Sequence, residues 1–229
     1  MTKVDEDLAL GTRGSRAAIA GLVFAALFVV GWMLLQRRPP LSSSDQELID
    51  YFSDPERRRA SRIVGLYIAP FAAIAFVWFM AALRARYVGT RGRENTLLAT
   101  VHLMAGSMFV AALFLVGSVE LAMVWMVDTA DGQVVDIAAV RAMLALGTAM
   151  SQMVGLRSAA VFIAISTTRA TRSGLFPRWF AALSFAFAAV LLLAATRLTA
   201  VTLLMPIWVA GSSVLVLVRR RMRDEGPDD

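Results

Sequence analysis

Four ionisable side chains lie inside long apolar stretches of the chain: His102, Glu120, Arg141 and Arg157. A charge in the hydrocarbon region is costly unless it is paired or hydrated, so these residues are the first candidates for proton relays, ion paths or binding sites. His102 and Glu120 share one face of a predicted helix, but they are 18 residues apart, which is about 27 Å along a helix axis. No polar residue lies between them on that face, so the sequence does not support a proton relay there.

Glu120 and Arg141 are expected to form an ion pair near the outer membrane interface. They flank a predicted turn centred near Gly132, 12 residues before it and 9 residues after it, so their depths differ by only about 4.5 Å. The aspartates of that turn could compete for Arg141, and one of them, Asp136, also predicts a helix N-cap. An intramembrane pair of this kind holds two helices together more often than it carries out transport.

Arg157 lies near the middle of the predicted fourth span. Helical side chains lean toward the N-terminus of their helix, which here faces outward, so Arg157 is not expected to reach the cytoplasmic interface. It is expected to point into protein or into a hydrated cavity. The candidate intramembrane polar site is therefore Arg157, His102 and Gln152, with a purely structural role for Arg157 as the alternative.

Composition excludes most other chemistry. The chain has no Cys and a single His, which removes disulfides, thiolate metal sites and multi-His metal or haem ligation within one chain. The sequence also lacks a Gly-rich phosphate loop, a Gly-x-Ser-x-Gly motif and paired carboxylates at depth. We therefore expect no enzyme activity, no cofactor and no metal site.

The apolar stretches predict an all-α protein, a polytopic membrane bundle of about six transmembrane helices. Of its residues 58% are hydrophobic and 17% are charged, and a helix needs roughly 20 apolar residues to cross a bilayer. A single bundle over residues 17–218 is expected between a tail at 1–16 and a tail at 219–229. A break is expected near Arg197, because one helix over the last two spans would be about 60 Å long. The predicted spans are 17–35, 62–83, 97–127, 137–167, 177–196 and 198–218.

The distribution of basic residues predicts the orientation, since Lys and Arg in short loops favour the cytoplasmic side. With the N-terminus inside, 14 basic residues face the cytoplasm and 8 face outward. Lys3 is the only lysine among the 23 basic residues, which is typical of GC-rich bacterial genes. We expect a multi-pass protein of a bacterial plasma membrane with both termini in the cytoplasm. Because the arginines stand in short blocks between apolar stretches, as membrane anchors do, nucleic acid is not expected as a partner.

The first external loop is expected to have structure of its own. Ser44 and Glu47 have the spacing of a capping box, and the residues after them have an apolar face, which predicts a short interfacial helix. Asp54 followed by Pro55 predicts an N-cap, so the second helix begins about two turns before the membrane. The foot of that helix carries the arginines at 57–59, either as solvated charges or as a docking site for a partner or an anionic lipid.

The stretch Arg172-Ser-Gly-Leu-Phe-Pro-Arg-Trp179 leads into an apolar span. It resembles uncharacterised bacterial multi-pass membrane proteins that share a Ser-Gly-x-x-Pro-Arg-Trp element at a cytoplasmic helix start. The segment from Ile68 to Trp78 and the Asp54-Pro-Glu-Arg entry are similar to part of that group, so the resemblance extends from about residue 50 to 218. It implies a membrane bundle without an assigned activity, and it carries over no catalytic or binding residue.

Two functions remain open at this point. The first is a non-enzymatic structural or accessory membrane subunit, whose partners are the lipid bilayer and either copies of itself or a larger membrane complex. The second is a small-solute or ion transporter with a polar cavity around Arg157. A stripe of polar and small residues on the fourth span, which includes Gln152 and Gly155, predicts close helix packing. The fourth span is therefore expected at the centre of the bundle.

Overall fold

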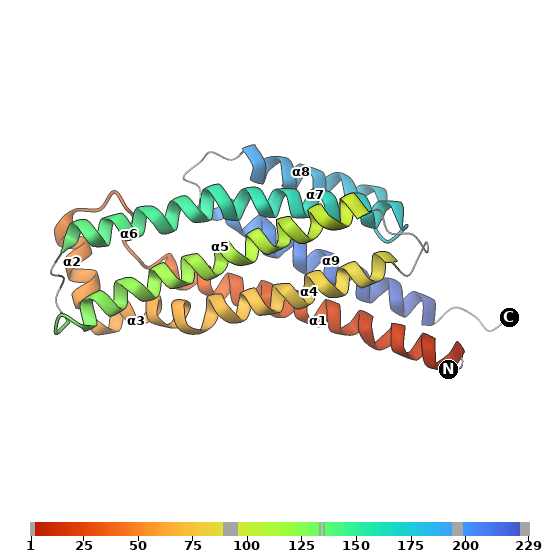
Figure 1. The fold of residues 1–229 in the computed structure, drawn as a ribbon, viewed down its shortest axis with the longest axis horizontal. Helices are drawn as coiled ribbons and strands as arrows, with labels where there is room; N and C mark the ends of the chain where they lie inside the picture. Colours follow the sequence, from red (N-terminus) through yellow and green to blue (C-terminus); the bar gives the residue numbers. More distant parts are fainter. Residues whose placement is uncertain (1–2, 89–95, 133, 135, 194–198, 225–229) are drawn as a thin grey trace.

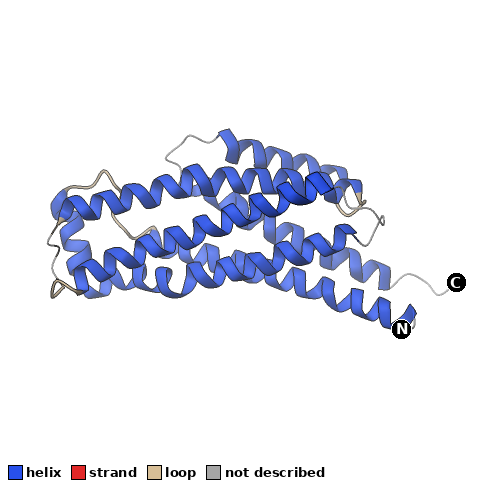
Figure 2. Ribbon diagram, viewed as in Figure 1, coloured by secondary structure: helices blue, strands red, loops and turns tan. Residues whose placement is uncertain are grey.

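A computed structural model describes residues 3–88, 96–132, 134, 136–193 and 199–224. The described residues form helices and the turns between them, without a strand (Figure 2), which confirms the prediction of an all-α helical bundle. The elements in chain order are α1 (Lys3–Leu35), α2 (Asp45–Ser53), α3 (Pro55–Ile63), η1 (Val64–Ile68), α4 (Ala69–Val88), α5 (Thr96–Asp128), α6 (Ile137–Met150), η2 (Ser151–Gly155), α7 (Leu156–Arg172), α8 (Arg178–Leu193), η3 (Thr199–Leu203) and α9 (Leu204–Asp224).

The long helices run side by side along one axis, and both termini lie at the same end of the bundle (Figure 1). The opposite end is closed by α2 and α3 with the end of α5 and the beginning of α6. We call this end the cap, defined as residues 36–63, 117–128 and 136–144.

Five helical stretches of the described chain are long and apolar enough to cross a membrane, and they correspond to five of the six predicted spans. These stretches are Ala18–Leu35, Pro55–Ala85, Thr96–Asp128, Ile137–Arg172 and Ala200–Val218. The other predicted span, 177–196, corresponds to α8, a shorter apolar helix of 16 residues. It packs along α7 (Figure 1). The predicted break near Arg197 lies outside the described residues.

Two of these stretches are longer than a bilayer is thick. The helix Thr96–Asp128 has 33 residues and the stretch Ile137–Arg172 has 36, which corresponds to about 50 Å or more against about 30 Å of hydrocarbon. The charged residues of α5 and of the beginning of α6 lie toward the cap. The excess length is sufficient for the cap to lie outside the hydrocarbon region.

A π turn lies within each of two long helices. In η1 the Ala69 N–H donates to the Val64 carbonyl, five residues earlier instead of four. Pro70 follows directly; it lacks an N–H, and its ring would collide with the carbonyl four residues before it. The wider turn accommodates the proline without ending the helix. In η2 the Leu156 N–H donates to the Ser151 carbonyl in the same manner.

Aromatic rings form the centre of the membrane-embedded core. The Phe76 ring on α4 packs against Phe24 of α1 at 5.0 Å, Phe109 of α5 at 4.9 Å and Phe162 of α7 at 5.0 Å between centroids. Tilted and edge-on contacts of this kind add to the burial of the rings. Toward the cap, η1 and α5 approach closely, since a Cβ on Gly65 would lie 2.8 Å from the carbonyl oxygen of Gly117. These contacts tie α1, α4, α5 and α7 into one unit.

The cap has a second hydrophobic core. The apolar face of α2 supplies Leu48, Tyr51 and Phe52, which are buried against residues of α5 and α6 such as Met123 and Leu144. The α2 helix is too short to be stable alone in water. Its packing over the ends of α5 and α6 is what fixes it in place.

Candidate functional site

Arg157 is bound to the backbone of its own helix. The residue is half-buried on the first turn of α7, and its Nη1 donates to the carbonyl oxygen of Gln152 at 2.6 Å. A π turn shifts backbone donors from four residues back to five, which opens a carbonyl near the turn to another donor. Arg157 supplies that donor, and its side chain reaches toward the N-terminus of the helix as predicted from helix geometry.

The other two residues of the predicted polar site have different surroundings. Gln152 contributes its backbone carbonyl to Arg157. His102 is buried on α5, with its Nδ1 3.1 Å from the Ser166 hydroxyl of α7 and its ring centroid 4.7 Å from that of Phe162. The structure therefore brings Arg157 and Gln152 together, and it gives His102 a separate polar contact that joins α5 to α7.

The predicted ion pair between Glu120 and Arg141 is wrong. Glu120 is buried and pairs with Arg38, which follows the end of α1. Arg141 pairs with Asp45 at the start of α2, with 2.7 Å between Nη2 and Oδ1. It also donates to two carbonyls of the loop before α2, at 2.9 Å from Leu41 and at 2.6 Å from Ser43. The first loop folds over the hairpin of α5 and α6, and it offers Glu120 and Arg141 closer partners than each other.

Two of the three arginines at the foot of α3 are exposed, which fits the alternative of solvated charges, and the third is buried. Arg57 and Arg59 are exposed, whereas Arg58 is only 7% exposed. The Arg58 Nη1 donates to the carbonyls of Phe52 at 2.8 Å and Ser53 at 3.1 Å, which close the C-terminus of α2. A cation at this end of a helix satisfies carbonyls that lack a partner within the helix and interacts favourably with its dipole.

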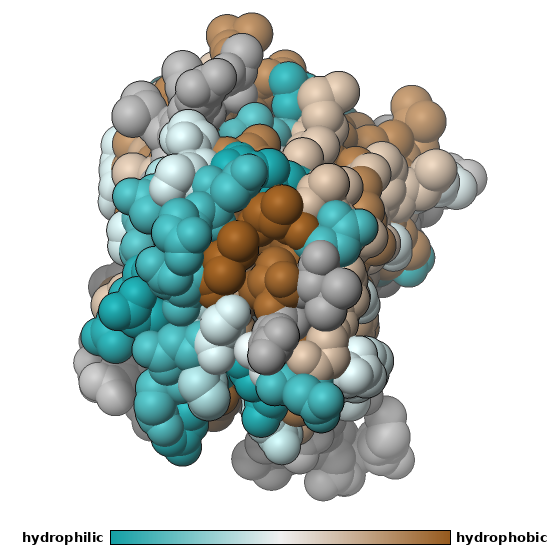
Figure 3. Space-filling view, turned by 90° about the vertical axis from the view of Figure 1, so that its left-hand side faces the viewer, coloured by the Kyte–Doolittle hydropathy of each residue, from teal (hydrophilic) through white to brown (hydrophobic). Residues whose placement is uncertain are grey.

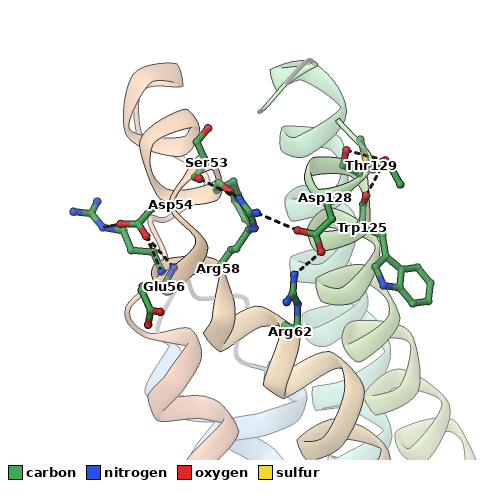
Figure 4. Close-up of polar contacts among 11 residues, drawn as sticks. Ser53, Asp54, Glu56, Arg58, Arg62, Trp125, Asp128 and Thr129 are labelled. Atoms are coloured by element: carbon green, nitrogen blue, oxygen red, sulfur yellow. Dashed lines mark hydrogen bonds and ion pairs between the residues drawn. The ribbon is translucent and has the colours of Figure 1, made fainter. Parts of the chain in front are cut away.

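Asp128 connects α3 to the end of α5. Its Oδ1 lies 3.1 Å from Arg58 Nη2, and its Oδ2 pairs with Arg62 (Figure 4). The figure shows the two guanidinium groups reaching the carboxylate from successive turns of one helix. Arg58 thus joins three elements of the cap, namely α2, α3 and α5.

The local signals of the first loop and of the turn after α5 are confirmed. Ser44 and Glu47 form both hydrogen bonds of a capping box at the start of α2. The Asp54 side chain caps α3, with Pro55 at its first position, and Asp136 caps α6.

Tyr51 is a buried titratable residue of the cap. Burial raises the pKa of its phenol above the ordinary value of 10.0, because the charged phenolate would lose its hydration. Its ring packs edge-on against Phe52, with 5.1 Å between centroids. The phenol therefore stays neutral over the physiological pH range.

An apolar cavity of about 130 Å³ lies beside both π turns. Its walls come from α1, η1, α4, α5, η2 and η3, and they include Gly31, Ile68, Ala112 and Gly155. Three of the lining residues carry polar side-chain groups, namely the hydroxyls of Ser151 and Thr202 and the indole N–H of Trp32. This composition suits an apolar group rather than an ion.

Comparison with protein-family models, curated proteins and solved structures found no match. The resemblance to bacterial membrane proteins with a Ser-Gly-x-x-Pro-Arg-Trp element therefore stays a prediction. In the part of the chain that the structure describes, no group of three or more His, Asp or Glu side chains is placed to hold a metal ion.

Sequence reasoning missed Arg38 and Asp45 as site residues. Both lie in or next to the first loop, and they bind residues 82 and 96 positions away in the chain. The capping box at Ser44 located α2, so it could have indicated that acidic Asp45 lies at a fixed helix start. No local signal indicates which helix that start will contact.

Proposed function

We propose that the protein is a non-enzymatic structural or accessory subunit of a bacterial plasma membrane. The observation that carries this proposal is the contact of Arg157 with the Gln152 carbonyl. An arginine held by the backbone of its own helix stabilises the π turn there. Glu120 and Arg141 are likewise engaged in contacts that hold the cap on the bundle.

The same contacts weigh against a transporter with a polar cavity around Arg157. Ion and solute paths through a membrane protein are lined by polar or charged groups that face water. The cavity beside η2 is lined mainly by apolar side chains. Arg157 is not among the lining residues of this cavity, and its Nη1 donates to the Gln152 carbonyl instead.

The cap is the part of the molecule that best suits a partner protein. Figure 3 views this end along the bundle and shows a compact apolar patch ringed largely by hydrophilic side chains. Val134 and Ile137 are partly buried apolar residues that pack against the cap core. An apolar centre with a polar rim is the usual anatomy of a protein interface. We therefore place the partner, an extramembrane segment of another subunit, on the end face of the cap.

Site-specific photo-crosslinking in intact cells tests this proposal. A photoreactive amino acid replaces Gln46, which is exposed on α2, or Val134, which is half-buried beside the cap core. The control position is Leu192, an exposed apolar residue of α8. We expect one discrete protein adduct from the cap positions and none from the control. An adduct of twice the chain mass identifies a homo-oligomer, and any other mass identifies a larger complex.

A measurement of the mass of the extracted protein, combined with the crosslinking, can reject the accessory role. The protein is extracted in mild detergent and its mass is determined by light scattering. A monomer, together with no protein adduct from either cap position, would overturn the accessory role.

A further inference from the structure

The apolar cavity beside the π turns is open on one side. Within the described residues, α1 packs mainly on α4 and α9, while η2 packs on α5, α6 and α7. In the described part of the chain, α1 and η2 both line the cavity without packing closely on each other. Trp32, Ser151 and Thr202 line the cavity, and each of them is only half-buried. Most of the lining residues belong to helical stretches that are apolar enough to cross a membrane, so lipid is the surrounding solvent.

The size and lining of the cavity determine what can enter it. A cavity of about 150 Å³ with an aliphatic and aromatic lining stays dry and takes up small apolar molecules. This one measures about 130 Å³. A partner helix, about 10 Å across with its side chains, cannot enter such a space. A single hydrocarbon chain can, and the surrounding bilayer supplies such chains.

An exposed arginine follows the cavity wall closely in the chain. Leu35, the last residue of α1, lines the cavity, and Arg37 follows two residues later with its side chain exposed. The neighbouring arginine, Arg38, is already paired with Glu120. Arg37 thus lies at the level where a lipid whose chain fills the cavity would carry its headgroup. Guanidinium groups bind phosphate oxygens through paired, charge-assisted hydrogen bonds.

We propose that this cavity is a binding site for one anionic phospholipid. Part of one acyl chain enters the space between α1 and η2, and Arg37 binds the phosphate. The small residues Gly31, Ala112 and Gly155 leave the room that the chain fills. The cavity is formed by the bundle, and Arg37 lies at the beginning of the cap, directly after α1.

Filling the cavity tests the chain-binding half of the proposal. A Cβ on Gly155 would lie 3.8 Å from the Ala112 Cβ, which is ordinary contact, so Gly155→Leu places the rest of its side chain in the cavity. Ala186→Leu, at an exposed position of α8, is the matched control. The proteins are reconstituted in nanodiscs of phosphatidylcholine with a minority of phosphatidylglycerol and are analysed by native mass spectrometry. We expect the wild type and the control to retain one phosphatidylglycerol and Gly155→Leu to lose it.

Removing the cation tests the headgroup half. Arg37→Gln should weaken the binding of phosphatidylglycerol about tenfold, the effect of losing one charge-assisted contact. Arg59→Gln, at an exposed arginine of α3, should leave binding unchanged. Equal retention of phosphatidylglycerol and phosphatidylcholine by the wild type would overturn the assignment of an anionic lipid.

Fluorescence quenching keeps the proposal testable if Gly155→Leu does not fold. Phosphatidylglycerol with brominated acyl chains is added to wild-type protein and to Trp32→Phe. Bromine quenches indoles that it contacts, so the wild type should show a saturable component that Trp32→Phe lacks. Identical quenching curves for the two proteins would overturn the proposal.

Discussion

Arg157 illustrates how an intramembrane charge can serve the backbone. Its position at mid-depth suggested a functional site, and its observed partner is the Gln152 carbonyl beside a π turn. A charged donor at an under-satisfied carbonyl contributes more than a neutral hydrogen bond does, because it is charge-assisted. The π turn next to Arg157 thus explains why a charged residue occurs within this apolar span.

Substitution of Arg157 separates the structural role from a role of the Gln152 side chain. Arg157→Met keeps the length of the side chain but removes the donor, and should lower the free energy of unfolding by about 1–2 kcal/mol. Gln152→Ala should have little effect, because the contact uses the backbone carbonyl. Thermal unfolding in detergent measures both. A large loss for Gln152→Ala with none for Arg157→Met would contradict the assignment.

The pair of Glu120 and Arg38 is the most buried ion pair between side chains in the described part of the chain, with 3% and 20% of the two side chains exposed. Glu120→Leu leaves Arg38 without its counter-charge and should cost about 2–3 kcal/mol. Adding Arg38→Met to Glu120→Leu should recover part of this loss, since a pair of apolar residues needs no counter-charge. The exposed pair of Arg59 and Glu56 is the control, and Glu56→Gln should cost about 0.5 kcal/mol or less. Equal effects at the two sites would count against a buried pair.

At the scale of elements, the cap is assembled from short pieces that depend on one another. The helix α2 has nine residues, and α3 has nine more. Their ends are closed by Ser44, Asp54 and Arg58 rather than by continued helix. Arg58 has the widest reach, because it binds the last carbonyls of α2 and the carboxylate of Asp128 on α5.

Loss of Arg58 should therefore loosen α2 without unfolding the bundle. Arg58→Met is expected to raise hydrogen exchange in residues 45–53 about tenfold or more, since it removes contacts worth at least about 1.5 kcal/mol. Exchange in α5 and α7 should stay as in the wild type. Arg57→Met, at the exposed neighbour, is the control and should change neither region. Increased exchange throughout the bundle would show that the cap and the bundle unfold together.

The burial of Tyr51 predicts how the cap responds to alkaline pH. Its folded pKa lies above the ordinary value of 10.0, so the unfolded state loses the phenolic proton first as the pH rises. The stability from the neutral phenol is complete below pH 10.0 and is lost progressively above it. Tyr51→Phe should remove this part of the alkaline destabilisation. Unfolding followed at several pH values checks it, and identical alkaline slopes for the two proteins would contradict it.

At the scale of the whole molecule, the two ends of the bundle differ. One end holds both termini, and the other is the folded cap (Figure 1). The arginines of the first loop and of α3 are among the 8 basic residues that face outward in the predicted orientation, and three of them, Arg38, Arg58 and Arg62, are bound to acidic residues of α5. They serve the tertiary structure of the cap, and the excess of basic residues near the termini still predicts that the termini face the cytoplasm.

Single-cysteine labelling tests this orientation directly, because the natural chain has no Cys. Ser42→Cys lies in the exposed loop of the cap, and Ser173→Cys lies in the turn between α7 and α8 at the other end. In intact spheroplasts a membrane-impermeant maleimide should label the first variant and leave the second unlabelled until the cells are opened. The reverse pattern would show that the cap faces the cytoplasm.

The sequence by itself determined those features that depend on neighbours along the chain. Five spans, the capping box at Ser44, the proline start at Pro55 and the N-cap at Asp136 follow from local hydrophobicity and local hydrogen bonding, and all are present. The structure alone decided which charges pair. Glu120 and Arg141 share a hairpin, yet each binds a residue more than 80 positions away, because the first loop folds over that hairpin. Pairing energy depends on distance in space and on burial, and local sequence specifies neither.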